Sequence, residues 1–500
     1  MTNAGADWMS RARALRLSVR DFVEGGWRPE CAAPSIEKYG PRDGRLLYTI
    51  GSSGSKMVNE AVAVARRAFE DGRWSRLPLE RRKEVLYRLA GLIEQHREEF
   101  ALRESLDVGK PVQGAYQFDV PVSAARLRTV AEGAEHVYGK VFAVDASNLS
   151  YQLRRPVGVV GGVVGWNFPL MLAIEKIGPV LAMGNCLVLK PSELTSLSAA
   201  RVAELAMEAG LPEGVLNVVH GGPTTGAALA EHPDIDLLTF TGSSRTGKAL
   251  LVAAGQSNMK RLVLECGGKA PNIVFDDCPD LEAAAEAIVA RAFWNQGEVC
   301  TASSRLLVQD GIHAGLLQRV VERLGALKPG DPLDARTTFG ALVSEGHRKK
   351  VTDYVRGGKE SDARVLYESN APAPLAGGFY LPPVIFDQVS PETRIAREEI
   401  FGPVLSVIRF RDEEEALQIA NATIYGLSAI LWTRDLGRAH RMSHNIRAGW
   451  IVVNATGRPA QGPGGGVLSI GGLKQSGIGV EGGIEGLTEY TSTSTVQMFV

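Results

Sequence analysis

From Pro156 onward the sequence alternates between short runs of β-forming residues and helix-like segments. The β-forming runs before residue 270 are VGVVGGVV, CLVLKPSE, VLNVVHG, LLTFTG and RLVLECGG, and stretches such as SLSAARVAELAMEAG separate them. Strands joined through helices pair in parallel, and a parallel sheet needs helices on both of its faces. The alternation therefore predicts a doubly wound α/β domain. Ligands of such sheets bind beyond the carboxyl ends of the strands.

A second α/β pattern starts after Cys300. A helix is expected around residues 314–327, and the strand-like runs are RLLVQ, YLPPVIF, GPVLSVIRF, GLSAILW and GWIVVN. A chain of 500 residues is longer than one hydrophobic core usually organises. We therefore expect a second domain here. Residues 1–20, by contrast, have the pattern of a poorly anchored terminus.

A predicted hairpin interrupts the helical N-terminal part of the chain. VFAVDASNLSYQLRR, residues 141–155, alternates apolar and polar residues about the turn-forming residues 145–148, as a β-hairpin does. The C-terminal tail EGLTEYTSTSTVQMFV also alternates and is rich in threonine. It is expected to form a strand that pairs with the hairpin, either within the chain or across subunits.

The composition argues against several classes of function. The formal net charge is -1, so no overall field favours nucleic acid or an anionic membrane. The five cysteines are scattered without a CxxC pair, which argues against a disulfide framework or a zinc cage and for a reducing compartment. We expect no metal site. The uncharged run from Pro156 to Ile174 is punctuated by glycine and proline, which favours a buried strand, a turn and a helix start over a membrane span.

The stretch FWNQGEVCTASSRL places Cys300 among small residues. Small neighbours leave a sulfur atom approachable, and a thiolate is a strong nucleophile where its surroundings lower its pKa or supply a base. An inert buried thiol is the alternative.

Two motifs follow predicted strands. In GWNFPL, Asn167 carries an amide donor that could face a developing oxyanion, or it is a turn residue. In LKPSE, Lys190 and Glu193 could hydrogen-bond ribose hydroxyls, whereas the alternative is a helix start capped by Ser192.

Three further motifs complete the set. In FTGSSRTGK, free N–H groups at a strand-to-helix turn could hold a pyrophosphate, although the spacing is neither GxGxxG nor a P-loop. In LECGGK, burial would raise the pKa of Glu265 toward that of a general base, and an ion-paired or solvated acid is the alternative. In REEIFGPV, Glu399 and Phe401 precede a strand.

With these motifs in this order, the sequence resembles the aldehyde dehydrogenase superfamily of the NAD(P)-dependent, hydrolytic kind, from about Asp21 to the C-terminus. The resemblance implies that Cys300 is the nucleophile, Glu265 the general base and Asn167, with the backbone N–H of Cys300, the oxyanion hole. It also places Lys176 near the active site. The residues it assigns to the cofactor are Trp166, Lys190, Ser192, Glu193, Gly221, Phe240, Gly242, Ser243, Glu399 and Phe401.

The resemblance further implies that an aldehyde is oxidised to a carboxylic acid through a thioester on Cys300, which water hydrolyses with Glu265 as base. A binding or structural protein of the same fold is the alternative. Glu193 favours NAD as the cofactor, with NADP also possible, because its carboxylate would oppose a 2′-phosphate.

The expected domains are an NAD-binding domain of residues 1–136 and 156–264, a catalytic domain of residues 265–473, and a small β oligomerisation arm of residues 137–155 and 484–500. The expected partners are a small-molecule aldehyde and further copies of the chain in a homodimer or homotetramer, without nucleic acid or membrane, in the cytoplasm.

Several positions depart from the family pattern. They are Gly165, Cys266, Ser469, Ile470, Val480 and the glycine-rich loop 457–468. Glu175 stands where many members have a tryptophan that lines the substrate tunnel. Glu175 either attracts a cationic or hydroxyl-bearing substrate, or it pairs with Lys176 or an arginine and has no substrate role.

Overall fold

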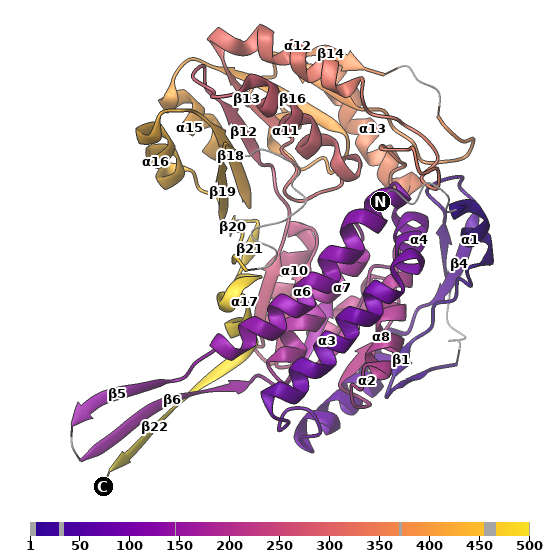
Figure 1. The fold of residues 1–500 in the computed structure, drawn as a ribbon, viewed down its shortest axis with the longest axis vertical. Helices are drawn as coiled ribbons and strands as arrows, with labels where there is room; N and C mark the ends of the chain where they lie inside the picture. Colours follow the sequence, from indigo (N-terminus) through magenta and orange to yellow (C-terminus); the bar gives the residue numbers. More distant parts are fainter. Residues whose placement is uncertain (1–6, 30–34, 146, 370–372, 455–466, 500) are drawn as a thin grey trace.

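The computed structural model describes residues 7–29, 35–145, 147–369, 373–454 and 467–499 (Figure 1). Most of the glycine-rich loop 457–468 therefore lies outside the described residues. Within those ranges no helix combines the length and apolar character needed to cross a membrane. The uncharged run that begins at Pro156 forms a buried strand, a turn and a helix start, as predicted.

The first sheet contains the predicted parallel strands. Its order is β2-β1-β9-β8-β7-β10-β11-β21. The five central strands pair in parallel, and they are β7 (Val159–Val163), β8 (Cys186–Lys190), β9 (Leu216–Val218), β10 (Leu237–Thr241) and β11 (Arg261–Glu265). Short antiparallel strands extend both edges, namely β1 (Phe22–Val23), β2 (Gly26–Trp27) and β21 (Gly477–Ile478).

Two groups of helices pack against this sheet. One group consists of α2 (Gly54–Glu70), α9 (Pro223–Glu231) and α10 (Ser244–Gln256). The other consists of α3 (Leu79–Gln95), α4 (Arg97–Val108), α6 (Val120–Gly133), α7 (Pro169–Ala182) and α8 (Leu197–Glu208). In α2 the apolar residues Val58, Ala61, Val62 and Ala65 recur at helical spacing and are buried, which is why this segment forms an amphipathic helix.

The expectation of a poorly anchored N-terminus is wrong for the residues that the structure describes. Trp8 opens α1 (Trp8–Ala14), is 2% exposed and packs with Ala101, Val112 and Leu333. Because the partners of Trp8 lie far along the chain, no local sequence pattern predicts this contact. Two further N-terminal strands, β3 (Ser35–Tyr39) and β4 (Leu46–Gly51), form a separate hairpin.

The second sheet has the order β14-β15-β16-β13-β12-β18-β19. Its strands are β12 (Pro271–Val274), β13 (Arg305–Gln309), β14 (Arg364–Glu368), β15 (Val384–Asp387), β16 (Val404–Phe410), β18 (Ser428–Trp432) and β19 (Trp450–Val453). All its pairings are parallel except that of β14 with β15. The predicted second α/β pattern is confirmed, and β12 and β14 add to it.

Helices cover both faces of the second sheet because apolar residues on its strands alternate between two cores. Leu307 packs in one core and its neighbours Leu306 and Val308 pack in the other. The first core includes residues of α13 (Glu345–Lys359), α14 (Arg394–Arg397), α15 (Glu413–Asn421) and α16 (Leu436–Asn445). The second includes residues of α11 (Leu281–Phe293) and α12 (His313–Leu324).

A three-stranded arm projects from the rest of the molecule (Figure 1). It is formed by the predicted hairpin, β5 (Lys140–Asp145) and β6 (Asn148–Pro156), and the predicted C-terminal strand β22 (Thr491–Phe499). Within the chain, β22 pairs with β6 from Thr491↔Pro156 to Phe499↔Asn148. All six residues of β5 are exposed. The short helix α17 (Gly483–Glu489) connects β21 to the arm.

Candidate active site

The predicted site residues gather around one cavity of about 960 Å³. Residues of the first sheet reach it from the carboxyl ends of the parallel strands, as the topology predicts. Residues of the second sheet reach it from the segments that precede β13 and β16. The predicted site residues that line it are Trp166, Asn167, Lys190, Ser192, Glu193, Phe240, Gly242, Ser243, Glu265, Cys300, Glu399 and Phe401.

A tightly constrained turn delivers Cys300 to the cavity. It follows the 3-10 turn Trp294–Gly297, in which Asn295, Gln296 and Gly297 have φ values of 48°, 57° and 74°. A Cβ added to Gly297 would lie 2.3 Å from the carbonyl oxygen of Gly402, so only glycine fits there. Left-handed backbone at non-glycine residues costs free energy and persists where the surroundings hold it. The Gln296 side chain supplies such support, since its Oε1 accepts from Gly340 N at 3.1 Å.

The amide of Asn167 is tied to the same turn. Its Nδ2 donates to the main-chain oxygen of Glu298 at 2.9 Å. Asn295 Nδ2 donates to the main-chain oxygens of Asn167 and Glu298 at 3.1 and 3.2 Å. The strand end that carries Asn167 and the turn that carries Cys300 are therefore held together, with one amide hydrogen of Asn167 left for a ligand.

The surroundings of Cys300 favour the neutral form of its thiol. Burial raises its pKa to about 12, and the carboxylates of Glu399 and Glu265 add to the effect. Its surroundings therefore do not lower the pKa, and a nearby base has to accept the thiol proton before the sulfur can act as a nucleophile.

Glu265, at the end of β11, has the properties of such a base. Burial raises its pKa to about 8, against the opposing charge of Lys176 and a hydrogen bond from Gly472. Its Oε1 has no hydrogen-bond partner among the described residues. This agrees with the expectation that burial moves the pKa of Glu265 toward neutrality.

Lys176 lies behind the cavity and does not line it. Its side chain is fully buried and forms an ion pair with Glu481. Burial lowers the pKa of Lys176 to about 7, although the charge of Glu265 opposes the shift. Glu481 does line the cavity, so Lys176 acts on the site through its charge on Glu265 and its contact with Glu481.

The residues predicted to bind the cofactor form a cradle in the same cavity. Lys190 Nζ lies 3.5 Å from Glu193 Oε2 at the end of β8. Ser243 caps α10 by accepting from Thr246 N at 3.2 Å. A Cβ on Gly242 would lie 2.4 Å from the Phe240 ring, so only glycine lets the chain pass there. A helix N-terminus that opens into a cavity suits a phosphate, and these residues fit such a group.

Glu399 and Phe401 face this cradle from the segment before β16. Glu399 Oε1 accepts from Gly268 N at 2.9 Å. A Cβ on Gly267 would lie 2.5 Å from Glu399 Oε2. Phe401 has a φ of 61° and packs edge-on against Trp166 with ring centroids 5.1 Å apart.

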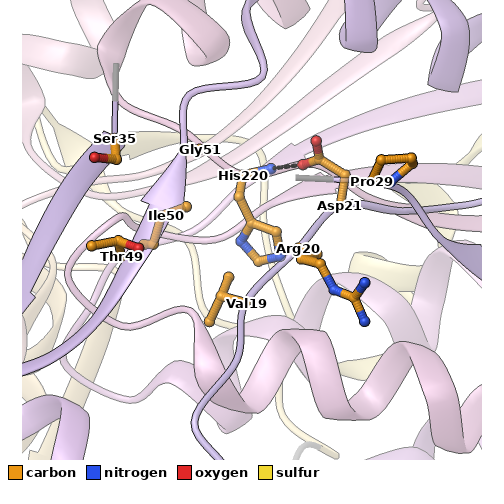
Figure 2. Close-up of a pocket in the computed structure, with 9 residues that line it drawn as sticks. All are labelled: Val19, Arg20, Asp21, Pro29, Ser35, Thr49, Ile50, Gly51 and His220. Atoms are coloured by element: carbon orange, nitrogen blue, oxygen red, sulfur yellow. Dashed lines mark hydrogen bonds between the residues drawn. The ribbon is translucent and has the colours of Figure 1, made fainter. Parts of the chain in front are cut away.

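Gly221, the remaining predicted residue, does not line the large cavity. Its φ is 144° and a Cβ would lie 2.2 Å from Thr225 Oγ1, so it serves the turn before α9. Its neighbour His220 lines a separate cavity of about 80 Å³ (Figure 2). There the His220 main-chain N donates to Asp21 Oδ1 at 2.7 Å.

Sequence reasoning missed three residues that shape the site. They are Glu481, which pairs with Lys176, Glu298, whose carbonyl holds Asn167, and Arg126 on α6, which forms an ion pair with Glu175 on α7. Of the two partners considered for Glu175, the structure therefore selects an arginine. Nothing in the sequence around Arg126 signals this, because the pairing depends on how α6 packs against α7.

Comparison with known proteins gives a consistent picture. A sequence model described as the aldehyde dehydrogenase family matches residues 27–496. The chain is 45% identical over 492 residues to the NADP/NAD-dependent aldehyde dehydrogenase PuuC of Escherichia coli (strain K12), covering 98% of each. It is 45% identical to the aldehyde dehydrogenase KauB from Pseudomonas aeruginosa, whose crystal structure superposes with a TM-score of 0.96 over 99% of each chain. A crystal structure of an indole-3-acetaldehyde dehydrogenase complexed with NAD+ matches equally well, at 45% identity, 99% coverage of each chain and a TM-score of 0.96.

Proposed function

This chain belongs to the aldehyde dehydrogenase family and oxidises an aldehyde with NAD, and from that premise we propose that Cys300 carries the acyl group. The observation that carries the proposal is the single cavity onto which Cys300, Asn167 and Glu265 all open. The cavity also holds the residues suited to a dinucleotide.

In the first half of the reaction the Glu265 carboxylate accepts the Cys300 thiol proton. The sulfur then adds to the aldehyde carbon, and the resulting alkoxide receives hydrogen bonds from the Asn167 amide and the Cys300 N–H. NAD, when bound, supplies a hydride acceptor. Loss of hydride from the former aldehyde carbon leaves a thioester on Cys300.

In the second half Glu265 acts on water. Its carboxylate, free again after releasing the first proton to solvent, takes a proton from a water molecule that attacks the thioester carbon. The tetrahedral intermediate collapses, the C–S bond breaks, and the carboxylic acid leaves with Cys300 as thiolate. The raised pKa of Glu265 suits this role, because a base that titrates near neutrality can both accept and release protons.

We propose that residues 1–136 and 156–264 form the NAD-binding domain and hold the adenosine and pyrophosphate end through Lys190, Ser192, Glu193, Gly242 and Ser243. The nicotinamide end would lie between Trp166 of that domain and Glu399 and Phe401 of the catalytic domain, residues 265–473. Phe240 and Gly221 would support the turns on which these residues lie. The two hydrophobic cores on the second sheet are distinct from the two on the first sheet, and this supports the division.

We propose that the arm of residues 137–155 and 484–500 joins subunits into a homodimer or homotetramer. Its edge strand β5 is exposed along its length and carries Val141 and Phe142, which are 76% and 41% exposed. An unpaired apolar edge strand is a surface that proteins normally cover. Cytoplasmic localisation is supported by the free thiols of Cys186, Cys266, Cys278 and Cys300, since such thiols persist in reducing compartments.

The test is NADH formation by wild type and Cys300→Ala with short aliphatic, aromatic and amino-aldehydes, each with NAD and NADP. We expect wild type to reduce NAD with at least one aldehyde and Cys300→Ala to reduce none while still binding NAD. Turnover that survives in Cys300→Ala would remove Cys300 from the role proposed. Cofactor binding without turnover of any aldehyde by wild type would instead favour the non-catalytic alternative.

A further inference from the structure

A partly buried ion pair forms part of the wall of the proposed aldehyde cavity. Arg126 on α6 contacts Glu175 on α7 through Nη1 and Oε1, and both side chains line the cavity with exposed fractions of 19% and 18%. They lie on the faces of the two helices that the cavity touches, since Val130 is four residues beyond Arg126 and Met171 four before Glu175.

The adjoining wall is apolar and aromatic. Phe118, Phe168 and Trp294 all line the cavity, and the Trp294 ring centroid lies 4.9 Å from that of Phe118 and 5.0 Å from that of Phe168. An alkyl chain would pack against this apolar wall, and the Arg126–Glu175 pair is the polar part of it.

The pair leaves hydrogen-bonding capacity unused. A guanidinium carries five N–H donors and a carboxylate accepts several hydrogen bonds. Among the described residues, Glu175 is the one partner of the Arg126 guanidinium, and the Arg126 Nε is buried without a partner. Burying an ion pair and an unpaired donor costs stability that apolar side chains of similar size would not cost. A role in ligand binding explains why such a pair lines a cavity.

For a substrate that runs along α7 from the Asn167 end, the position of the pair on this helix sets the chain length that reaches it. Asn167, the proposed oxyanion donor, precedes the helix, which begins at Pro169. Glu175 is six residues beyond Pro169, or about 9 Å along the helix axis at about 1.5 Å per residue. An extended carbon chain gains about 1.2 Å per bond, so about seven bonds span this distance.

We propose that the Arg126–Glu175 pair determines substrate specificity, and that it selects aldehydes whose apolar chain ends in a neutral hydrogen-bonding group about seven bonds from the carbonyl carbon. This inference rests on the proposed function of the cavity. A primary amide is the best match, because its oxygen accepts from the guanidinium and its N–H donates to the carboxylate.

The preference for a neutral substrate end follows from the opposite charges of Arg126 and Glu175. Arg126 and Glu175 cancel, so a substrate end with a net charge would bring an uncompensated charge into a mostly apolar cavity, which is costly. Removing either charge of the pair should make the cavity prefer a charged substrate end. Glu175→Gln leaves a free guanidinium that attracts a carboxylate, and Arg126→Gln leaves a free carboxylate that attracts a cation.

The experiment compares kcat/KM for octanal, 8-oxooctanamide, 8-oxooctanoate and 8-(trimethylammonio)octanal, with propanal as a substrate too short to reach the pair. Wild type is expected to prefer the amide to octanal by about tenfold or more. The ratio of carboxylate to ammonium substrate should rise by about 10²-fold in Glu175→Gln and fall by about 10²-fold in Arg126→Gln. Propanal turnover should stay close to wild type in both.

Matched controls come from an ion pair between α6 and α3. Arg128 pairs with Glu94 at 2.9 and 2.6 Å on the exposed side of α6, so Arg128→Gln and Glu94→Gln should leave all ratios unchanged. Equal efficiencies for octanal and the amide in wild type would overturn the inference without any variant. Unchanged ratios in both cavity variants, with propanal still oxidised, would also overturn it. If wild type oxidised neither propanal nor the longer aldehydes, the proposed function itself would fail.

Discussion

The side-chain amide of Asn167 donates to the main-chain oxygen of Glu298 at 2.9 Å, and Glu298 lies two residues before Cys300. This bond fixes the amide plane relative to the nucleophile before any substrate arrives. Donors that are held in place need no reorganisation when charge develops on the substrate, and this is the main reason that such sites stabilise oxyanions.

Asn167→Ala should therefore lower kcat strongly. Loss of one oxyanion donor typically costs about 10²–10³ in kcat. Among the described residues, the buried Glu298 carbonyl would keep only its bond from Asn295. NAD affinity should change little. Steady-state kinetics together with NAD titration would check this, and a variant with a raised KM but an unchanged kcat would contradict the assignment of Asn167.

Glu265→Gln should separate the two halves of the reaction. The amide cannot accept a proton from water, so the thioester should accumulate after one turnover, and steady-state hydrolysis should fall by about 10²–10⁴. Because a base is needed for the thiol as well, acylation should also slow. Rapid-quench detection of acylated Cys300 would reveal the intermediate, and undiminished steady-state turnover would contradict the role of Glu265.

The pH dependence of thioester hydrolysis should reflect the ionisation of Glu265. The pKa of Glu265 is about 8, so the carboxylate form that acts as base becomes more abundant as pH rises through about 8. Hydrolysis should rise over that range. Lys176 lowers the pKa of Glu265, so Lys176→Met should move the profile to higher pH. Lys260→Met should leave the profile in place, because this buried lysine bonds to the Ala230 carbonyl, does not itself line the cavity and does not affect the pKa of Glu265.

Sequence patterns predicted those parts of the site that lie at the ends of strands. Asn167, Lys190 and Glu265 each follow an apolar run whose length and β-branched content define a strand, and parallel pairing then brings the three ends together. Cys300 and Glu399 could be related to them through the resemblance to the family. The arm was predictable as well, because the sequences of its hairpin and of the C-terminal tail alternate between apolar and polar residues.

The remaining features depend on packing between distant segments. Lys176 and Glu481 are 305 residues apart in sequence, and no sequence pattern around either residue predicts that they pair. Arg126 meets Glu175 because α6 packs against α7. The raised pKa of Cys300 arises from burial and from the charge of Glu399. The pairing of β13 with β16 brings these two residues near each other, because each precedes one of those strands.

Glu193 should control the choice between NAD and NADP. Its carboxylate lines the cavity beside Lys190 and would repel a 2′-phosphate, so Glu193→Gln should raise kcat/KM for NADP relative to NAD by about tenfold. Glu231→Gln is a matched control, because Glu231 also lines the cavity but lies on α9. An unchanged ratio of kcat/KM for NADP to that for NAD in Glu193→Gln would show that another group discriminates between the two cofactors at the ribose.

His220 should make the protein less stable as pH falls below neutrality. Its ring is buried with no partner for either nitrogen among the described residues, and burial with the charge of Lys190 lowers its pKa to about 3. The unfolded chain binds the proton near its ordinary pKa of about 6.5, so between these two values the unfolded state holds more protons and stability falls with falling pH. From about pH 7.5 to about pH 5.5 this amounts to about 1.4 kcal/mol. His220→Leu should remove this contribution to the pH dependence of the free energy of unfolding. His136→Gln, at an exposed histidine, should retain it. Denaturant unfolding at the two pH values would measure the difference, and equal slopes for wild type and His220→Leu would show that the imidazole in the small cavity (Figure 2) already has a partner that stabilises its charge.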